Sequence, residues 1–228
     1  MSALCGVVHP GAAYLLTDGA SFDAQHNVRQ IGSKVLELPT HRMAIGWSGY
    51  LMIEDLQAAV IAAGITQADV FLALPAIVRD LAFANEAVGV RDGVPTPPVY
   101  LLIALWNEAR NEPQLWAVDS CTTLLGPRYT PFTHVQLRAK FALHPDEQAA
   151  AFGRQIKPTD PANFDVRRDG VTMIETERAK PFEGGHYGVG GFVELTSVTV
   201  DGVTKETLLQ WNDKIGHRIN PARSGTRT

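Results

Sequence analysis

A serine, an aspartate and a lysine near the start of the chain have the residue types and the order of a nucleophile and the charged groups that activate it. Ser2 follows the initiator Met1, Asp18 ends an apolar run, and Lys34 follows a glycine-containing turn. Removal of Met1 would give Ser2 a free α-amine, and an amine with a pKa of roughly 7.7–8.0 accepts a hydroxyl proton near neutral pH. A lysine near that hydroxyl stabilises the developing alkoxide, and a carboxylate beside the lysine keeps it charged and in place. These residues therefore predict an N-terminal serine nucleophile.

The order and spacing of these residues resemble those of the N-terminal nucleophile hydrolases, most closely the β subunits of proteasomes and their bacterial relatives. In that family the nucleophile opens a strand, an Asp ends the second strand, and a Lys begins the third. The resemblance covers residues 2–64 and 184–212 and implies that Ser2, Asp18 and Lys34 are catalytic, with Ser in place of the usual Thr. It implies an α+β fold, a four-layer αββα sandwich of two mostly antiparallel sheets between helical layers. It also implies a peptide or amide substrate and no cofactor.

Two further segments belong to the site that the resemblance implies. The turn Gly46–Gly49 could direct backbone N–H groups at a substrate oxyanion, and the resemblance assigns this donor to Gly49, or to Ser48 if the register slips by one. The resemblance also places His186 where the family has an Asp, and Val189 where it has a Ser. A neutral His186 could orient the freed α-amine, whereas a protonated imidazole would repel it.

Two other functions stay open from the sequence. Cys5-Gly6 resembles the Cys-Gly start of the glutamine amidotransferases and acylases, so removal of residues 1–4 would expose Cys5 as a nucleophile. The chain could instead be a non-catalytic member of the proteasome-like family, serving as a structural or assembly subunit of, for example, a bacterial or phage particle. His186 and Val189 favour this second alternative, because neither residue matches the family's site.

The composition narrows the class of protein. A chain of 228 residues can form one large domain with its own core. A net charge of −4, from 20 basic and 24 acidic residues, indicates neither a nucleic-acid partner nor a membrane surface. The sequence shows no apolar run of transmembrane length and no signal peptide, so a cytoplasmic location is expected. The two cysteines make no disulfide framework and the seven histidines show no metal-ligand spacing, so no metal is expected.

The elements that must position these residues can be predicted most clearly in the first half of the chain. Apolar runs on either side of turn signals predict three strand pairs, and their near-continuous apolar character indicates sheets covered on both faces. The pairs are 3–8 with 12–17, 35–38 with 42–47, and 99–106 with 114–118. Helices are predicted over Ile53–Ala63 and Ala68–Ala87, and Pro75 predicts a kink or a break in the longer one.

The second half of the chain carries weaker signals. They predict a strand within 129–143, helices over 146–154 and 163–180, and a hairpin of 190–200 with 205–211 around Asp201-Gly202. The buried side of the second of these helices is expected to consist of Phe164, Val171, Met173 and Ile174. Residues 1–212 are accordingly interpreted as a single domain, and residues 213–228 as an exposed C-terminal tail rich in Arg, Gly and Ser.

The two helical stretches 53–63 and 68–87 carry more apolar residues than one sheet face needs. The excess predicts an exposed apolar patch, which usually marks an interface, and closed symmetric assembly into a homo-oligomer is the expected use. The alternative is that Pro75 folds the second helix back on the first, so that the extra side chains pack within the helical layer. The apolar residues concerned are Leu51, Met52, Ile61, Ile65, Phe71, Leu74, Leu81 and Phe83.

Overall fold

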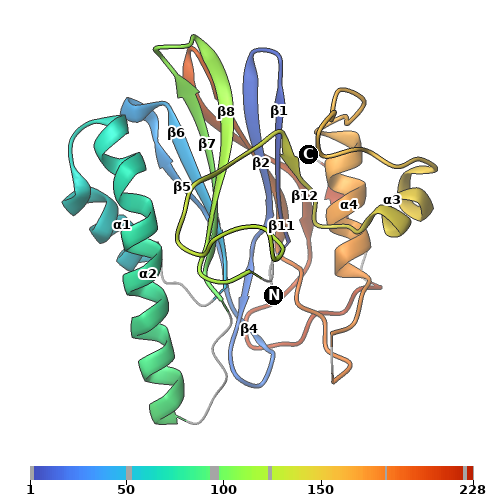
Figure 1. Cartoon of the computed structure of the whole chain (residues 1–228). Coiled ribbons are helices and arrows are strands. Elements are labelled where there is room, and N and C mark those ends of the chain that lie inside the picture. Colours follow the sequence, from blue (N-terminus) through green and yellow to red (C-terminus); the bar gives the residue numbers. More distant parts are fainter. Residues whose placement is uncertain are drawn as a thin grey trace.

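Two antiparallel sheets face each other, and helices cover their outer faces (Figure 1). The structure is a computed structural model that describes residues 3–49, 53–92, 98–122, 125–182, 184–222 and 225–227. The layers follow the order helices, sheet, sheet, helices, and the predicted α+β architecture with antiparallel sheets is confirmed. The arrangement buries both faces of each large sheet, which explains why the strands are apolar with little alternation.

The larger sheet has six strands and places the first hairpin of the chain beside the last. β1 (Leu4–His9) and β2 (Ala12–Asp18) form the predicted strand pair, with a register that runs from Leu4↔Thr17 to His9↔Ala12. β2 also pairs with β11 (Phe192–Thr199), so Asp18 lies opposite Val193. In sheet order the strands are β10 (Ala139–Lys140), β1 (Leu4–His9), β2 (Ala12–Asp18), β11 (Phe192–Thr199), β12 (Gly202–Trp211) and β13 (Gly225–Arg227).

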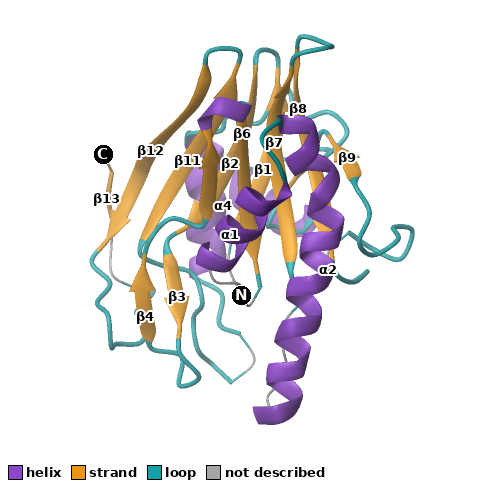
Figure 2. Ribbon diagram, turned by 90° about the vertical axis from the view of Figure 1, so that its left-hand side faces the viewer, coloured by secondary structure: helices purple, strands orange, loops and turns teal. Residues whose placement is uncertain are grey.

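The second sheet has five strands, and a separate hairpin follows β2. The other two predicted pairs both form within this sheet. Its strands, in sheet order, are β5 (Val35–Leu38), β6 (Met43–Ser48), β7 (Tyr100–Asn107), β8 (Glu112–Asp119) and β9 (Val135–Leu137), with a 3₁₀ turn η1 (Pro39–His41) between β5 and β6. The separate hairpin consists of β3 (Ala20–Phe22) and β4 (Val28–Ile31), and Figure 2 shows it beyond the ends of the large sheets.

Within the described ranges, four α-helices cover the outer faces of the sheets. α1 (Ile53–Ala63) and α2 (Gln67–Asp92) lie on the five-stranded sheet, and α3 (Pro145–Phe152) and α4 (Arg168–Arg178) lie on the six-stranded sheet (Figure 1). α1 has the bounds that the sequence predicts, whereas α4 begins five residues later than predicted. The Asp165 carboxylate accepts hydrogen bonds from the N–H groups of Arg167 and Arg168, which caps the chain just before the helix.

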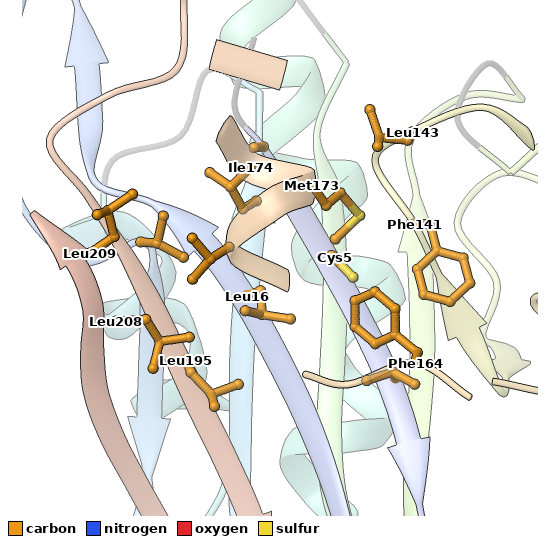
Figure 3. Packing of buried hydrophobic residues seen from close by; sticks show 14 of the residues in the cluster. Cys5, Leu16, Phe141, Leu143, Phe164, Met173, Ile174, Leu195, Leu208 and Leu209 are labelled. Atoms are coloured by element: carbon orange, nitrogen blue, oxygen red, sulfur yellow. The ribbon is translucent and has the colours of Figure 1, made fainter. Parts of the chain in front are cut away.

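The core consists of three main layers of side chains. One lies between the sheets and includes Leu4 and Leu15 from the first and Leu102 and Leu115 from the second. A second lies between the five-stranded sheet and α1–α2. The third lies between the six-stranded sheet and α3–α4, where Cys5 and Leu16 pack with the residues predicted to be buried, which lie in α4 and in the segment just before it (Figure 3). Those predicted residues are Phe164, Val171, Met173 and Ile174, and all are buried.

The prediction of a break at Pro75 is wrong, because α2 continues through it to Asp92. Proline lacks the N–H that would bond the carbonyl of Phe71 one turn earlier. His134 supplies the missing donor: its Nε2 lies 2.8 Å from the Phe71 carbonyl oxygen, and its ring stacks on the Phe71 ring with centroids 4.0 Å apart. The second helix therefore does not fold back on the first, and α2 extends past the ends of the strands in Figures 1 and 2.

The segment 129–143, predicted to supply one strand, connects the two sheets instead. Its first part forms β9, which pairs with β8 of the five-stranded sheet. Its second part forms β10, which pairs with β1 of the six-stranded sheet through Gly6↔Lys140 and Val7↔Ala139.

The C-terminal segment is also corrected, because it is anchored to the fold rather than wholly exposed. The Asp213 side chain is 2% exposed and forms an ion pair with Arg178. Ile219 is buried against Ala20 and Val28 of the β3–β4 hairpin. β13 adds a last strand to the six-stranded sheet. The composition of the segment predicts an exposed tail, but these three contacts attach it to the rest of the fold.

Candidate active site

Asp18, the last residue of β2, is fully buried and accepts four described hydrogen bonds. Oδ1 accepts the N–H of Ala3 at 3.1 Å and the ammonium of Lys34 at 2.7 Å. Oδ2 accepts the N–H groups of Ala20 at 3.3 Å and Gly190 at 3.1 Å. A carboxylate has about four lone-pair sites, so these donors occupy its full capacity. Asp18 thus joins the start of β1, the β3–β4 hairpin and the segment that leads into β11.

Lys34 extends its side chain to Asp18 from the end of the loop between β4 and β5. The residue is 6% exposed. Burial lowers the pKa of the Lys34 ammonium, and the charge and hydrogen bond of Asp18 act in the opposite direction. Its carbonyl oxygen accepts the N–H of Trp47, so the backbone of Lys34 is held by β6 as well.

The residue before Lys34 is fixed by a second polar network. The Ser33 hydroxyl donates to Oε1 of Glu194 on β11 at 2.5 Å. The ammonium of Lys205 on β12 donates to Ser33 Oγ at 2.8 Å and also pairs with Glu37 of β5. These contacts tie the start of β5 to two strands of the other sheet, so the backbone that carries Lys34 is fixed on both sides.

The predicted nucleophile, Ser2, lies outside the described residues. The first described residue is Ala3, which is 3% exposed and whose N–H bonds to Asp18. That nitrogen is the atom to which Ser2 is joined. The structure therefore brings Asp18 and Lys34 together with the described end of the chain, as the spacing predicts, and the catalytic roles of the three residues stay predictions.

Gly49 lies directly after β6 in a conformation that only glycine adopts without strain. Its φ is +107°, and a Cβ atom there would lie 2.1 Å from the carbonyl oxygen of Pro98. Ser48, the alternative oxyanion donor, pairs with Tyr100 as the last residue of β6. The close approach to Pro98 explains the glycine sterically, so its role as an oxyanion donor stays a prediction.

His186 lies in the loop between α4 and β11 and stacks on His26 of the β3–β4 turn. The two ring centroids are 3.4 Å apart and the planes differ by 12°. Desolvation lowers the pKa of His186, and the charges of His26 and Arg218 lower it further. Val189, at the place where the resemblance has a Ser, is 1% exposed and contributes an apolar side chain to the helix-side core.

The sequence did not identify Gly190 as a partner of Asp18. It also did not identify the buried ion pair Arg178–Asp213, which contacts the peptides on either side of Gly190. The doubled glycine Gly190-Gly191 was a signal, because a Cβ at position 190 would lie 2.4 Å from Ile219 Cδ1 and 2.7 Å from Asp213 Oδ2. His26 gives no signal beyond its turn, where it has a φ of +62°.

The Cys5 alternative places the nucleophile in the interior of β1. Cys5 is fully buried in the core between the six-stranded sheet and α4 (Figure 3), and burial raises the pKa of its thiol far above the usual range. A thiol in that state is protonated and a poor nucleophile. Within the described ranges, Cys5 is therefore a core residue, while Asp18 and Lys34 are polar groups that the core surrounds.

The described part of the chain contains no group of three or more His, Cys, Asp or Glu side chains arranged to hold a metal ion. Among the described helices, none combines the length and the apolar character needed to span a bilayer. Comparison with models of known protein families gave no match, and a search of curated proteins gave none either.

Proposed function

We propose that this chain is an amide or peptide hydrolase of the N-terminal nucleophile type, resembling proteasome β subunits, and that Ser2 is its nucleophile after removal of Met1. One observation carries the proposal: the buried carboxylate of Asp18 binds both the ammonium of Lys34 and the N–H of Ala3, the residue joined to Ser2. A buried ion pair is not needed to close a core of this size, because apolar side chains of similar volume do so at least as well.

The chemistry begins with the α-amine that removal of Met1 creates. The amine takes the proton from the Ser2 hydroxyl, and the oxygen attacks the carbonyl carbon of the substrate amide. The ammonium of Lys34 stabilises the negative charge on the nucleophile. The backbone N–H of Gly49 donates a hydrogen bond to the oxyanion that forms on the substrate carbonyl oxygen. The protonated α-amine then gives its proton to the leaving amine, and an ester on Ser2 remains. Water, deprotonated by the same α-amine, hydrolyses that ester and restores the hydroxyl.

Burial of Lys34 supports this role physically. Electrostatic groups act more strongly where water is excluded, and Lys34 is 6% exposed. Asp18 keeps the ammonium charged against the cost of burial, which lowers the Lys34 pKa. The pair can therefore hold a positive charge beside the nucleophile without competition from solvent.

The experiment that tests the proposal combines N-terminal mass analysis with a serine-reactive probe. We expect loss of Met1 and covalent labelling of Ser2 by the probe. Ser2→Ala should abolish labelling and turnover of peptide and amide substrates while it leaves the fold intact, and Ser2→Thr should retain both. Exposed Ser21 offers a matched control, since Ser21→Ala should change neither. Full activity in Ser2→Ala would overturn the proposal.

A second candidate function is a structural or assembly subunit of the same fold, and two observations favour it. Val189 offers an apolar, buried side chain where the resemblance expects a hydroxyl. The α1–α2 layer also exposes large apolar side chains, namely Ile61, Ile65, Leu72 and Phe83. Assembly through this layer is compatible with either function, whereas the labelling of Ser2 distinguishes a catalytic chain from a scaffold.

A further inference from the structure

A second buried ion pair, Arg178–Asp213, is connected to Asp18 through the peptide between Val189 and Gly190. The guanidinium of Arg178, on α4, donates to both carboxylate oxygens of Asp213 at 2.8 Å, and the two side chains are 3% and 2% exposed. The guanidinium also lies over the ring of Trp211, 4.4 Å from its centroid, and donates to the carbonyl of Asn220. Arg178 is therefore fixed in a single orientation by the C-terminal segment.

One planar peptide connects this pair to the candidate active site. The carbonyl oxygen of Val189 accepts from Arg178 at 3.0 Å, and the N–H of the same peptide, on Gly190, donates to Asp18 Oδ2 at 3.1 Å. Because the peptide unit is rigid, the guanidinium on its oxygen sets the direction of its N–H. A cation on the oxygen also strengthens the N–H as a donor, since hydrogen bonds in a chain polarise one another.

The following peptide is held in a similar way. Its N–H, on Gly191, donates to Asp213 Oδ2 at 2.8 Å, and its carbonyl oxygen, on Gly190, accepts the N–H of Gly19 at 2.9 Å. Gly19 is the residue directly after Asp18. The two peptides thus run between two carboxylates, with Asp18 on one side and Asp213 on the other.

We propose that Arg178 and Asp213 are positioning residues that hold the Asp18 carboxylate against Lys34 through the peptides of Gly190 and Gly191. The C-terminal segment that carries Asp213 is then part of the site. The inference rests on the proposed function only in treating Asp18 and Lys34 as reactive groups. The positioning itself is a physical property of the folded chain and is measurable without turnover.

The test uses nuclear magnetic resonance of the full chain with isotope-labelled lysine and glycine. Asp213→Asn removes the charge that Arg178 needs, and the milder Arg178→Lys and Asp213→Glu keep the pair but change its reach. In each folded variant we expect the Gly190 amide to exchange about tenfold faster or more. We also expect the Lys34 pKa to fall by roughly half a unit or more, because a less well placed Asp18 supports the ammonium less.

A matched control exists on the same helix. Asp169 of α4 pairs with Arg154 and is 4% exposed, but no described contact joins it to Gly190 or Gly191. Asp169→Asn should lower stability to a comparable degree and leave the Lys34 titration and the Gly190 exchange unchanged.

Unchanged values in the folded Arg178→Lys and Asp213→Glu variants would overturn the inference, as would an equal response in Asp169→Asn. These outcomes differ from a failure of the proposed function. Full hydrolysis by Ser2→Ala would remove the function and leave the positioning measurements untouched.

Discussion

The ammonium of Lys34 lies 2.7 Å from Oδ1 of Asp18, and the two side chains are 8% and 0% exposed. Taking two charges out of water costs several kcal/mol for each, on the order of what their attraction returns. The pair is therefore a weak explanation of stability and a better explanation of chemistry. Its position supports chemistry too, because the Asp18 carboxylate also binds the N–H of the first described residue, Ala3.

The first prediction concerns the stability of this pair. Lys34→Met leaves the Asp18 carboxylate buried without its counter-ion, and we expect the free energy of unfolding to fall by about 3–5 kcal/mol. The double variant Lys34→Met/Asp18→Asn should recover part of that loss, because no charge stays buried and the amide oxygen of Asn can still accept backbone N–H groups at this position. Urea denaturation measures both. The exposed pair Arg79–Asp80 is the control, since Arg79→Ala should cost less than about 1 kcal/mol.

The second prediction concerns pH. Burial lowers the Lys34 pKa in the folded chain below the ordinary value of 10.5. Between these two values the unfolded chain binds more protons than the folded chain, so the stability contribution of Lys34 must rise with pH in that window. Below the window both states are protonated and the contribution is flat. The difference in unfolding free energy between wild type and Lys34→Met, followed from neutral pH to 10.5, should show this rise, and a fall would contradict the burial argument.

The sequence predicts those parts of the fold whose signals are local. The apolar runs 3–8 and 12–17 predict the first strand pair, and the apolar spacing of 53–63 predicts α1. Both elements form as predicted. Asp18 ends β2 of the six-stranded sheet and Lys34 directly precedes β5 of the five-stranded sheet, so their contact depends on how the two sheets pack. Their meeting was predicted from a spacing pattern, and their catalytic role stays to be tested.

The parts that the sequence does not predict depend on distant partners. Pro75 indicates a break, yet His134 bonds the carbonyl that Pro75 leaves without a donor. Asp213 stands in a segment with the composition of a tail, yet its partner Arg178 lies 35 residues earlier, at the end of α4. In both cases a single side chain far away in sequence determines the outcome, and no local pattern reports it.

The third prediction concerns the two stacked imidazoles. Desolvation is the largest cause that lowers the pKa of His186, and the charge of His26 is the next. Removing the His26 ring should therefore raise the His186 pKa toward 6.5. His26→Asn is the suitable variant, because Asn tolerates the positive φ of this turn. Titration of the His186 ring protons measures the shift. His41 is half-buried and has no described contact with either ring, so His41→Asn is the control and should leave the His186 pKa unchanged. An unchanged His186 pKa in His26→Asn would mean that the stacking has no electrostatic effect.

The fourth prediction concerns Pro75 and His134. His134→Ala leaves the Phe71 carbonyl without its donor, and we expect a loss of about 1–3 kcal/mol in unfolding free energy. Pro75→Ala restores an N–H four residues after Phe71, so it should recover more stability in the His134→Ala background than it gains in wild type. A double-mutant cycle in urea measures this coupling. Simple additivity of the two changes would show that His134 does not compensate for the proline.

The fifth prediction concerns assembly through the α1–α2 layer. Of the apolar residues that the sequence singles out, Leu74 is buried, Leu51 and Met52 lie outside the described residues, and several others are exposed. Ile65 is 92% exposed and Leu72 is 72% exposed, and α2 extends past the sheets (Figure 2). Large apolar side chains exposed together mark an interaction surface. A closed symmetric assembly would bury this same surface on every copy of the chain.

Light scattering at micromolar concentration should therefore give a multiple of 24.8 kDa. Leu72→Lys should shift that mass toward the monomer, because burying a lysine in an apolar interface is costly. Ile215→Lys is the matched control, since Ile215 is 63% exposed in the C-terminal segment and should leave the assembly intact. A strictly monomeric wild type, with no dependence on concentration, would refute assembly and leave the α1–α2 surface exposed in the working protein.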